Sequence, residues 1–194
     1  MNETYTYQDL ISLFEESIRK AQDFESVPDD LLATKPDTSS WSAVEIFQHI
    51  VNFNRIYLRF IDRAIRKPKT LPTTKKNSFS PRFAAGYLVR IMLPPYKIKI
   101  PTIAPMKPEK FDLEEIKNIL QELIETNQEI LKYLGEAEEK NLDINRIKGK
   151  NSVFKISMTV VEFLLVFDAH QRRHFWQAEQ TLQKLSGKAP GSSL

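Results

Sequence analysis

The chain has 194 residues, of which 41% are hydrophobic and 27% charged, so it has enough apolar material for a sizeable core and is not globally disordered. It contains no cysteine, which excludes disulfide scaffolds, cysteine zinc fingers, iron–sulfur sites and cysteine nucleophiles. There is no apolar run long enough for a membrane span and no secretory signal pattern in the first ten residues, so we expect a cytoplasmic location. The net charge of +3 is too small to indicate nucleic acid, and we expect none.

Two helices are predicted in the first 66 residues, and both open on the same start signal. An apolar residue precedes a capping side chain, an acid follows the cap by three positions, and another apolar residue comes next. Thr6 with Asp9 fits this signal, and so does Ser42 with Glu45. Helical apolar spacing follows each cap, at Leu10, Phe14, Ile18, Ala21 and Phe24, and then at Ile46, Phe53, Ile56, Phe60 and Ala64.

Residues 66–110 differ in composition from the rest of the chain. They hold eleven basic residues, one acid (Glu109) and eight of the eleven prolines. We interpret this segment as a long crossover between helices, because it is too long for a tight turn. Short strands at 70–74 and 98–103 are conceivable, although prolines argue against them. Large apolar residues indicate that part of the crossover packs on the body: Phe79, Phe83, Tyr87, Leu88, Ile91, Met92 and Leu93.

Two further helices follow the crossover. Asp112 with Glu115 opens one, for which Gly135 is the expected stop, and Thr159 with Glu162 opens the other, which runs to about Leu185. The break between them falls at the polar stretch around Gly149. The predicted fold is therefore all-α, a four-helix bundle forming a single domain over residues 1–194, with a long crossover between the second and third helices.

The sequence has three histidines, and helical spacing places all of them toward the bundle interior. His170 and His174 stand four residues apart on the last helix and share one face, while His49 lies on the apolar stripe of the second helix. Neutral imidazole suits zinc, nickel and iron(II), and three protein ligands leave coordination positions open, as in catalytic sites. Metal binding should weaken below the ordinary histidine pKa of about 6.5, because protons compete for the same nitrogens.

A different interpretation is that the histidines are ordinary core residues, since a lone buried histidine is more often hydrogen-bonded than metal-bound. Three imidazoles buried together without a metal would, however, leave several polar atoms unsatisfied, and this favours the metal site. Asn52, Asn127 and Gln177 are candidates to line the pocket or orient a ligand, with ordinary hydrogen bonding as the alternative for each. Glu45 and Glu162 are better explained as helix caps, and Asp168 and Arg172 are expected off the inward face.

At these residues the chain resembles the DinB-like superfamily, which includes the YfiT-like metal-dependent hydrolases and thiol transferases. The resemblance rests on Trp41-Ser42-x-x-Glu45-x-x-x-His49, on Thr159-x-x-Glu162, and on His170-x-x-x-His174-x-x-Gln177. It implies a divalent transition metal (zinc, nickel or iron(II)) held by His49, His170 and His174. Many members have a histidine just before the last ligand, where this chain has Arg173.

The resemblance also implies a metal-dependent enzyme, a hydrolase or a thiol transferase, acting on a small molecule with a low-molecular-weight thiol as one candidate cosubstrate. No residue stands out as a general base, so a metal-bound water or thiol would itself be the nucleophile. The alternative is a non-catalytic interaction protein whose basic crossover docks on an acidic partner. The sequence leaves the native metal, the substrate and the oligomeric state open, a homodimer included.

Overall fold

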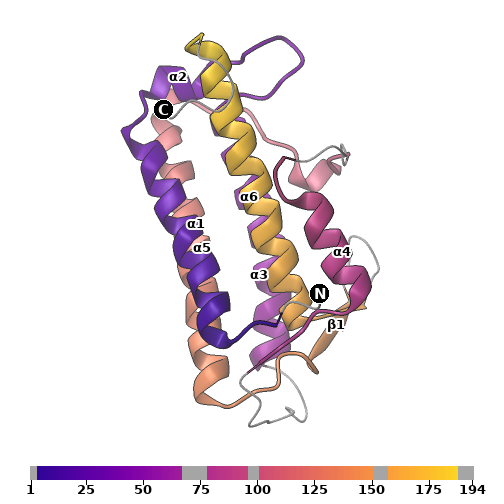
Figure 1. Cartoon of the computed structure of the whole chain (residues 1–194). Helices are drawn as coiled ribbons and strands as arrows, with labels where there is room; N and C mark the ends of the chain where they lie inside the picture. The colour runs from indigo at the N-terminus through magenta and orange to yellow at the C-terminus, as the bar shows by residue number, and fades with distance from the viewer. Residues whose placement is uncertain (1–3, 67–77, 96–100, 151–156, 188–194) are drawn as a thin grey trace.

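The computed structural model describes residues 4–66, 78–95, 101–150 and 157–187. Four long helices dominate these residues: α1 (Tyr7–Asp23), α3 (Ala43–Arg66), α5 (Ile116–Glu139) and α6 (Val160–Leu185). Figure 1 shows them lying lengthwise beside one another in an elongated bundle, which confirms the predicted all-α fold. Within the described ranges, every helix is too short or too polar to traverse a bilayer.

The order of the helices around the bundle does not follow the order along the chain. Both α1 and α3 pack against α5 and against α6. Over the described residues, α1 makes little contact with α3, and α5 little with α6, so these two pairs lie diagonally, whereas α3 and α5 are neighbours. The second and fourth long helices, α3 and α6, are therefore neighbours, as the histidine site requires.

All four predicted start signals form. The amide of Asp9 donates to Thr6 Oγ1 at 3.1 Å, and the Thr6 amide donates to the Asp9 carboxylate at 2.7 Å. Ser42 with Glu45 and Thr159 with Glu162 make the same reciprocal pair. The Asp112 signal opens a 3₁₀ turn, η3 (Leu113–Glu115), which runs directly into α5. Each cap satisfies amides that a helix start leaves unpaired, and so fixes where its helix begins.

One predicted helix end is wrong. Gly135 lies inside α5, which continues to Glu139. The chain leaves the helix at Asn141, whose φ of 50° places it in the left-handed region, and asparagine tolerates that region better than most residues. The apolar stripe also continues past the glycine, because Ala137 is fully buried. Burial of this last turn therefore outweighs the low helix propensity of glycine.

The crossover contains more structure than its composition predicts. It includes the helix α4 (Phe83–Met92), which packs on α6, and the 3₁₀ turn η2 (Ala104–Met106). Residues 101–103 form no strand, and the expectation for 70–74 and 98–100 falls outside the described residues. Of the apolar residues expected to pack on the body, Phe79 and Met92 are buried, whereas Phe83 and Tyr87 on the outer face of α4 are 86% and 59% exposed.

The remaining elements are short. The turn η1 (Phe24–Ser26) and the helix α2 (Asp29–Ala33) connect α1 to α3. The break around Gly149 is an antiparallel hairpin of β1 (Lys148–Lys150) and β2 (Ser157–Thr159), with Lys148 opposite Thr159. The hairpin lies so close to α3 that a Cβ at position 149 would overlap the ring of Phe60. Close packing, and not a turn, is what requires glycine here.

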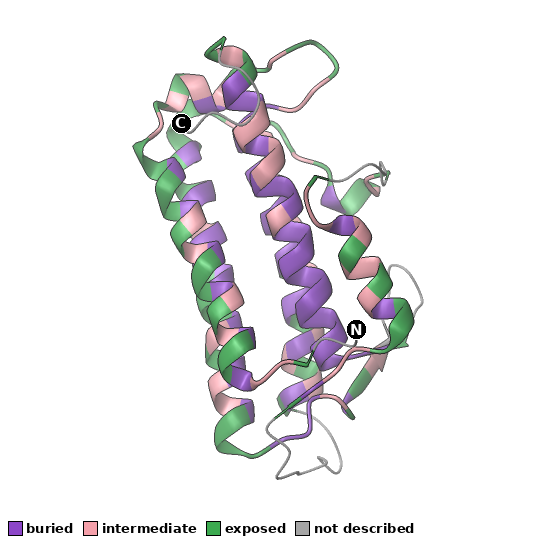
Figure 2. Cartoon of the chain, in the orientation of Figure 1, coloured by how far each residue is buried: buried purple, intermediate pink, exposed green. Residues whose placement is uncertain are grey.

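The core is divided by a layer of polar side chains. One apolar cluster holds Phe14, Phe53 and Phe167, and a second holds Ala21, Phe47 and Phe175. Buried polar residues from all four long helices fall between the two clusters, and α6, which Figure 2 shows buried along most of its length, contributes the most. We call this set the polar layer: Ser17, His49, Asn54, Thr126, Asn127, His170, Gln171 and His174.

The position of Gly135 inside α5 leads to a stability prediction. Because no atom lies within 4 Å of the position that a Cβ would take, Gly135→Ala should raise the free energy of unfolding by about 0.5–1 kcal/mol, measured by urea denaturation. Gly149→Ala is the matched contrast and should lower it by about 1–3 kcal/mol, since Phe60 must move. A loss of stability in Gly135→Ala would show that the helix does not continue through this position.

Candidate metal centre

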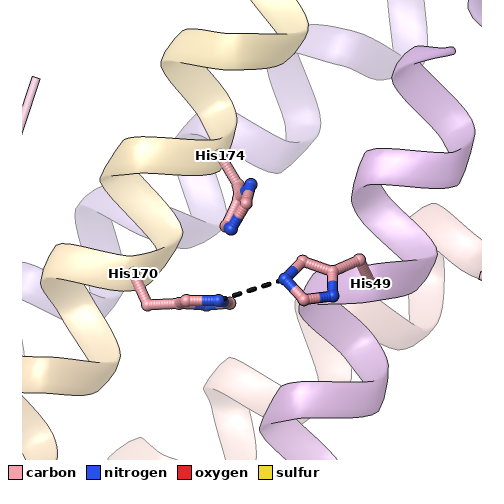
Figure 3. Close-up of side chains that lie close together, drawn as sticks. All are labelled: His49, His170 and His174. Atoms are coloured by element: carbon pink, nitrogen blue, oxygen red, sulfur yellow. Dashed lines mark hydrogen bonds between the residues drawn. The ribbon is translucent and has the colours of Figure 1, made fainter. Parts of the chain in front are cut away.

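The three histidines meet inside the bundle. His49 comes from α3, while His170 and His174 come from adjacent turns of α6 (Figure 3). Their side chains are 3%, 7% and 8% exposed, so all three are buried. The chain reaches this arrangement because each histidine occupies a core-facing position of an amphipathic helix and the two helices are neighbours.

The ring nitrogens are close enough for one ion to contact all three rings. The Nε2 atoms of His49 and His170 are 3.2 Å apart, and one ligand nitrogen from each histidine lies within 4.8 Å of the others. This spread is slightly wider than the 4 Å or so that a fully formed zinc site would give, since zinc–nitrogen bonds are about 2.0–2.1 Å. Among the described residues, the cluster consists of histidines alone.

Hydrogen bonds fix the orientation of two of the rings. His49 Nδ1 lies 2.6 Å from the carbonyl oxygen of Met106, and His174 Nδ1 lies 2.9 Å from Gln177 Oε1. Since neither oxygen carries a proton, each Nδ1 must donate. The Nε2 atom of each ring then bears the lone pair, which is the form in which histidine binds a metal.

The carbonyl that holds His49 comes from the crossover, which is attached to α3 by two further contacts. Asn52 Nδ2 donates to the carbonyl of Lys107 at 3.2 Å, and the amide of Glu109 donates to Gln48 Oε1 at 2.6 Å. Three side chains on one face of α3 therefore hold residues 106–109. This attachment places a backbone oxygen behind His49, and it explains why a long connection passes the site.

His170 is held differently. Its ring stacks on Phe53 with centroids 3.7 Å apart and planes inclined by 12°, and it is buried among the other two imidazoles. Its Nδ1 atom has no hydrogen-bond partner. A buried ring nitrogen without a hydrogen-bond partner costs free energy, so the placement of His170 is unfavourable as core packing alone.

Burial disfavours the protonated form of all three histidines. It lowers the pKa of His49, although the hydrogen bond to Met106 opposes the shift. Burial lowers the pKa of His170 well below its ordinary value, with the other two imidazoles and Arg173 adding to the shift. Burial also lowers the pKa of His174 to about 3, with His49 and Arg173 adding to the shift and the hydrogen bond to Gln177 opposing it. The pH expectation from the sequence therefore changes, because folding moves proton competition for these nitrogens to lower pH than the ordinary histidine pKa of about 6.5.

The other residues singled out from the sequence have distinct places. Gln177 contacts His174, as described. Asn52 is half-buried and holds the crossover, and Asn127 makes an interhelical hydrogen bond to Gln171 at 2.9 Å. Neither asparagine bonds a histidine. Asp168 is buried and not off the inward face, because α6 is covered by α1, α3 and α4; its carboxylate pairs with Arg172 at 3.0 Å.

Three contacts of the site were missed by sequence reasoning. A backbone carbonyl such as that of Met106 cannot be recognised from the type of its side chain. Phe53 fits the pattern of an ordinary core residue. Trp41 fits the pattern of the apolar residue that precedes a helix cap. In the structure the centroid of its ring lies 5.2 Å from that of the His49 ring. Its position eight residues before His49, at the start of the same helix, was the available signal for this contact.

Comparison with known proteins places this arrangement in a family. No curated protein sequence matches the chain. Among solved structures, YfiT from Bacillus subtilis, described as a probable metal-dependent hydrolase with an unusual four-helix bundle topology, superposes with a TM-score of 0.57 at 14% identity, covering 94% of this chain and 89% of its own. That likeness supports the fold. The family model of the DinB superfamily matches residues 13–178, and the chain therefore belongs to the DinB superfamily.

Proposed function

We propose that the chain binds one divalent transition metal through His49, His170 and His174 and acts as a metal-dependent hydrolase on a small molecule. The observation that carries the proposal is the convergence of three buried imidazoles, two of them held in place by hydrogen bonds at Nδ1. Imidazole nitrogens suit zinc, nickel and iron(II), and three protein ligands leave a position for substrate. An ion held there supplies Lewis acidity, which makes a water or a thiol a stronger nucleophile.

The surrounding residues prepare the site in three ways. The Met106 carbonyl and Gln177 hold protons on the Nδ1 atoms, which keeps the opposite nitrogens basic. Trp41 and Phe53 cover ring faces and exclude water from the imidazoles. The positive charge of Arg173 disfavours imidazolium at His170 and His174, so the neutral, metal-binding form prevails.

Hydrolysis and thiol transfer make similar demands on this site. Among the described residues, no carboxylate joins the cluster, and the carboxylate of Asp168 is engaged by Arg172. The described residues thus offer no acidic general base at the cluster, and both reactions would depend on a nucleophile that the ion activates. The description of YfiT as a probable metal-dependent hydrolase favours hydrolysis as the first reaction to test.

The alternative, a non-catalytic protein that docks through its basic crossover, has less support. Arg66 bonds Glu136 at 2.9 Å, and Arg82 bonds Glu162 at 2.7 Å. These two crossover arginines are thus engaged with acids of the bundle itself, which reduces the charge available to a partner. The alternative also gives the three converging histidines no role.

Metal content tests the site directly. Elemental analysis of protein purified without a metal-binding tag should find close to one divalent transition metal per chain, and His49→Ala and His174→Ala should lose it. Gln177→Ala should retain the ion with an affinity about tenfold lower, because the partner that orients a ligand is lost. Gln180→Ala, on the same helix but bonded to Gln183, is the control and should bind normally. Stoichiometry near zero, with no uptake of added zinc or nickel, would refute the metal site.

The pH dependence of stability distinguishes the effect of metal removal from the effect of histidine protonation. Removing the ion with a chelator should lower the melting temperature at pH 7.5, because the folded chain presents all three ligands together. The loss should persist at pH 5.5, since burial lowers the pKa of all three imidazoles in the fold.

Both forms should be less stable at pH 5.5, for a reason that lies in the unfolded chain. Unfolded histidines take up protons below a pKa of about 6.5, while the folded ones, with lowered pKa values, take up fewer, and this costs up to about 1 kcal/mol for each histidine at pH 5.5. Stability is thus lost as pH falls below 6.5. Thermal unfolding with and without chelator measures both effects, and an absence of any chelator effect at pH 7.5 would mean that the histidines are core residues.

Turnover distinguishes the enzyme from a binding protein. We expect zinc- or nickel-loaded protein to hydrolyse members of a panel of small esters and amides, and to lose that activity in His170→Ala and on chelation. The same panel, run with a low-molecular-weight thiol and electrophiles, tests transfer. A metal-loaded protein that turns over neither set, yet binds an acidic partner with steep salt dependence, would establish the docking alternative.

A further inference from the structure

A cavity lies near the start of α6, away from the histidine ligands along that helix. It has a volume of about 450 Å³ and is lined by five residues: Arg82, Asn145, Arg146, Lys148 and Thr159. Figure 1 shows β1, the start of α4 and the start of α6 gathered at this end. Eleven residues of α6 separate Thr159 from His170, which is about 16 Å at 1.5 Å per residue, so the cavity is separate from the proposed metal centre.

Among the described residues, the lining of the cavity is positively charged and contains no acid. Arg82 is already committed, because its guanidinium binds both oxygens of the buried Glu162 carboxylate and the carbonyl of Ser157. Arg146 and Lys148 are exposed, and within the described residues neither forms an ion pair. The pair of Arg82 and Glu162 is neutral overall, and two positive charges therefore remain for a ligand.

The backbone holds both of these cations in place. The amide of Arg146 donates to the Asp143 carbonyl at 2.9 Å, within a turn that the Asp143 carboxylate also braces through the amide of Asn145. Lys148 lies in β1, paired with Thr159 of β2. Two cations from separate elements are thus presented to one cavity by an ordered backbone, which reduces the entropy lost on binding.

The attraction comes from the side chains and not from the start of α6. The first amides of that helix, at Val160 and Val161, donate to the carbonyls of Ile147 and Ile144. The Thr159 hydroxyl accepts from the Glu162 amide. Since these amides are occupied, and the backbone amide of Asn145 bonds Asp143, a ligand must be recognised by the side chains of Arg146, Lys148 and Asn145.

We propose that this cavity binds a small molecule bearing a phosphate monoester. A monoester is a dianion at neutral pH, which matches the two uncommitted positive charges, and arginine hydrogen-bonds phosphate through paired N–H groups. The cavity is within the usual range for ligand sites of about 300–1,000 Å³ and has room for an organic group beside the phosphate. The proposal does not depend on the metal centre, and either could fail alone.

An NMR titration tests the proposal on the full chain. Phenyl phosphate should shift the amide resonances of Asn145, Arg146 and Lys148 and leave those near His170 unchanged, and benzoate, with one charge, should bind at least tenfold more weakly. Arg146→Gln and Lys148→Gln should each weaken phenyl phosphate about tenfold, because each removes a charged hydrogen-bond donor. Arg90→Gln is the control, since this exposed arginine lies on α4 outside the cavity lining, and it should bind as the wild type does.

Raising the ionic strength from about 0.01 M to 1 M should weaken binding strongly, because the Debye length falls from about 30 Å to 3 Å. Inorganic phosphate should shift the same amides but bind less tightly than the ester. The proposal is overturned if phenyl phosphate leaves these amides unshifted, if benzoate binds equally well, or if both cavity variants retain wild-type affinity. Shifts confined to residues around His170 would also overturn it, since they would place the phosphate at the metal centre.

Discussion

The side-chain amide of Gln171 is the contact on which the alignment of the bundle depends. It forms a reciprocal pair with Asn127 of α5, at 2.9 Å in both directions, accepts from Asn54 of α3 at 3.4 Å, and reaches Ser17 of α1 at 3.5 Å. One residue of α6 is therefore bonded to the other three long helices. Apolar contacts tolerate small shifts of one helix along another, but buried amides do not, because a shifted amide would lose its partners.

The adjacent residue in the chain is His170, and the geometry of the histidine cluster follows from this register. Gln171 points into the centre of the bundle, so His170 and His174 point toward α3, where His49 lies. The crossover then completes the site from outside through the Met106 carbonyl. The helices thus bring the imidazoles together, whereas the connection outside the bundle sets the tautomer of one of them.

Local signals in the sequence were sufficient for the helix starts and for the pair of histidines on the last helix. Caps such as Thr6 with Asp9 act within one turn, and the spacing of His170 and His174 already places them on one face. The addition of His49 depends on α3 and α6 being neighbours, which only the fold decides. The helix end predicted at Gly135 is wrong because burial of the turn that follows it is a tertiary effect. The Met106 carbonyl, α4 and the basic cavity escaped prediction for the same reason: each depends on where the crossover or hairpin lies against the bundle.

The polar layer lowers the stability of the fold, so its presence calls for another role. Asn54 Oδ1 and His170 Nδ1 are buried without hydrogen-bond partners, and an apolar core of the same shape would avoid both penalties. The side-chain amides of the polar layer offset part of this cost by fixing the register of the helices. The histidines do not offset it, because each contributes a ring that is buried and must stay neutral. In the metal site that we propose, part of this cost would be offset, because hydrogen bonds at Nδ1 already orient His49 and His174 before an ion binds. The proposal thus gives the three buried imidazoles a role that packing alone does not supply.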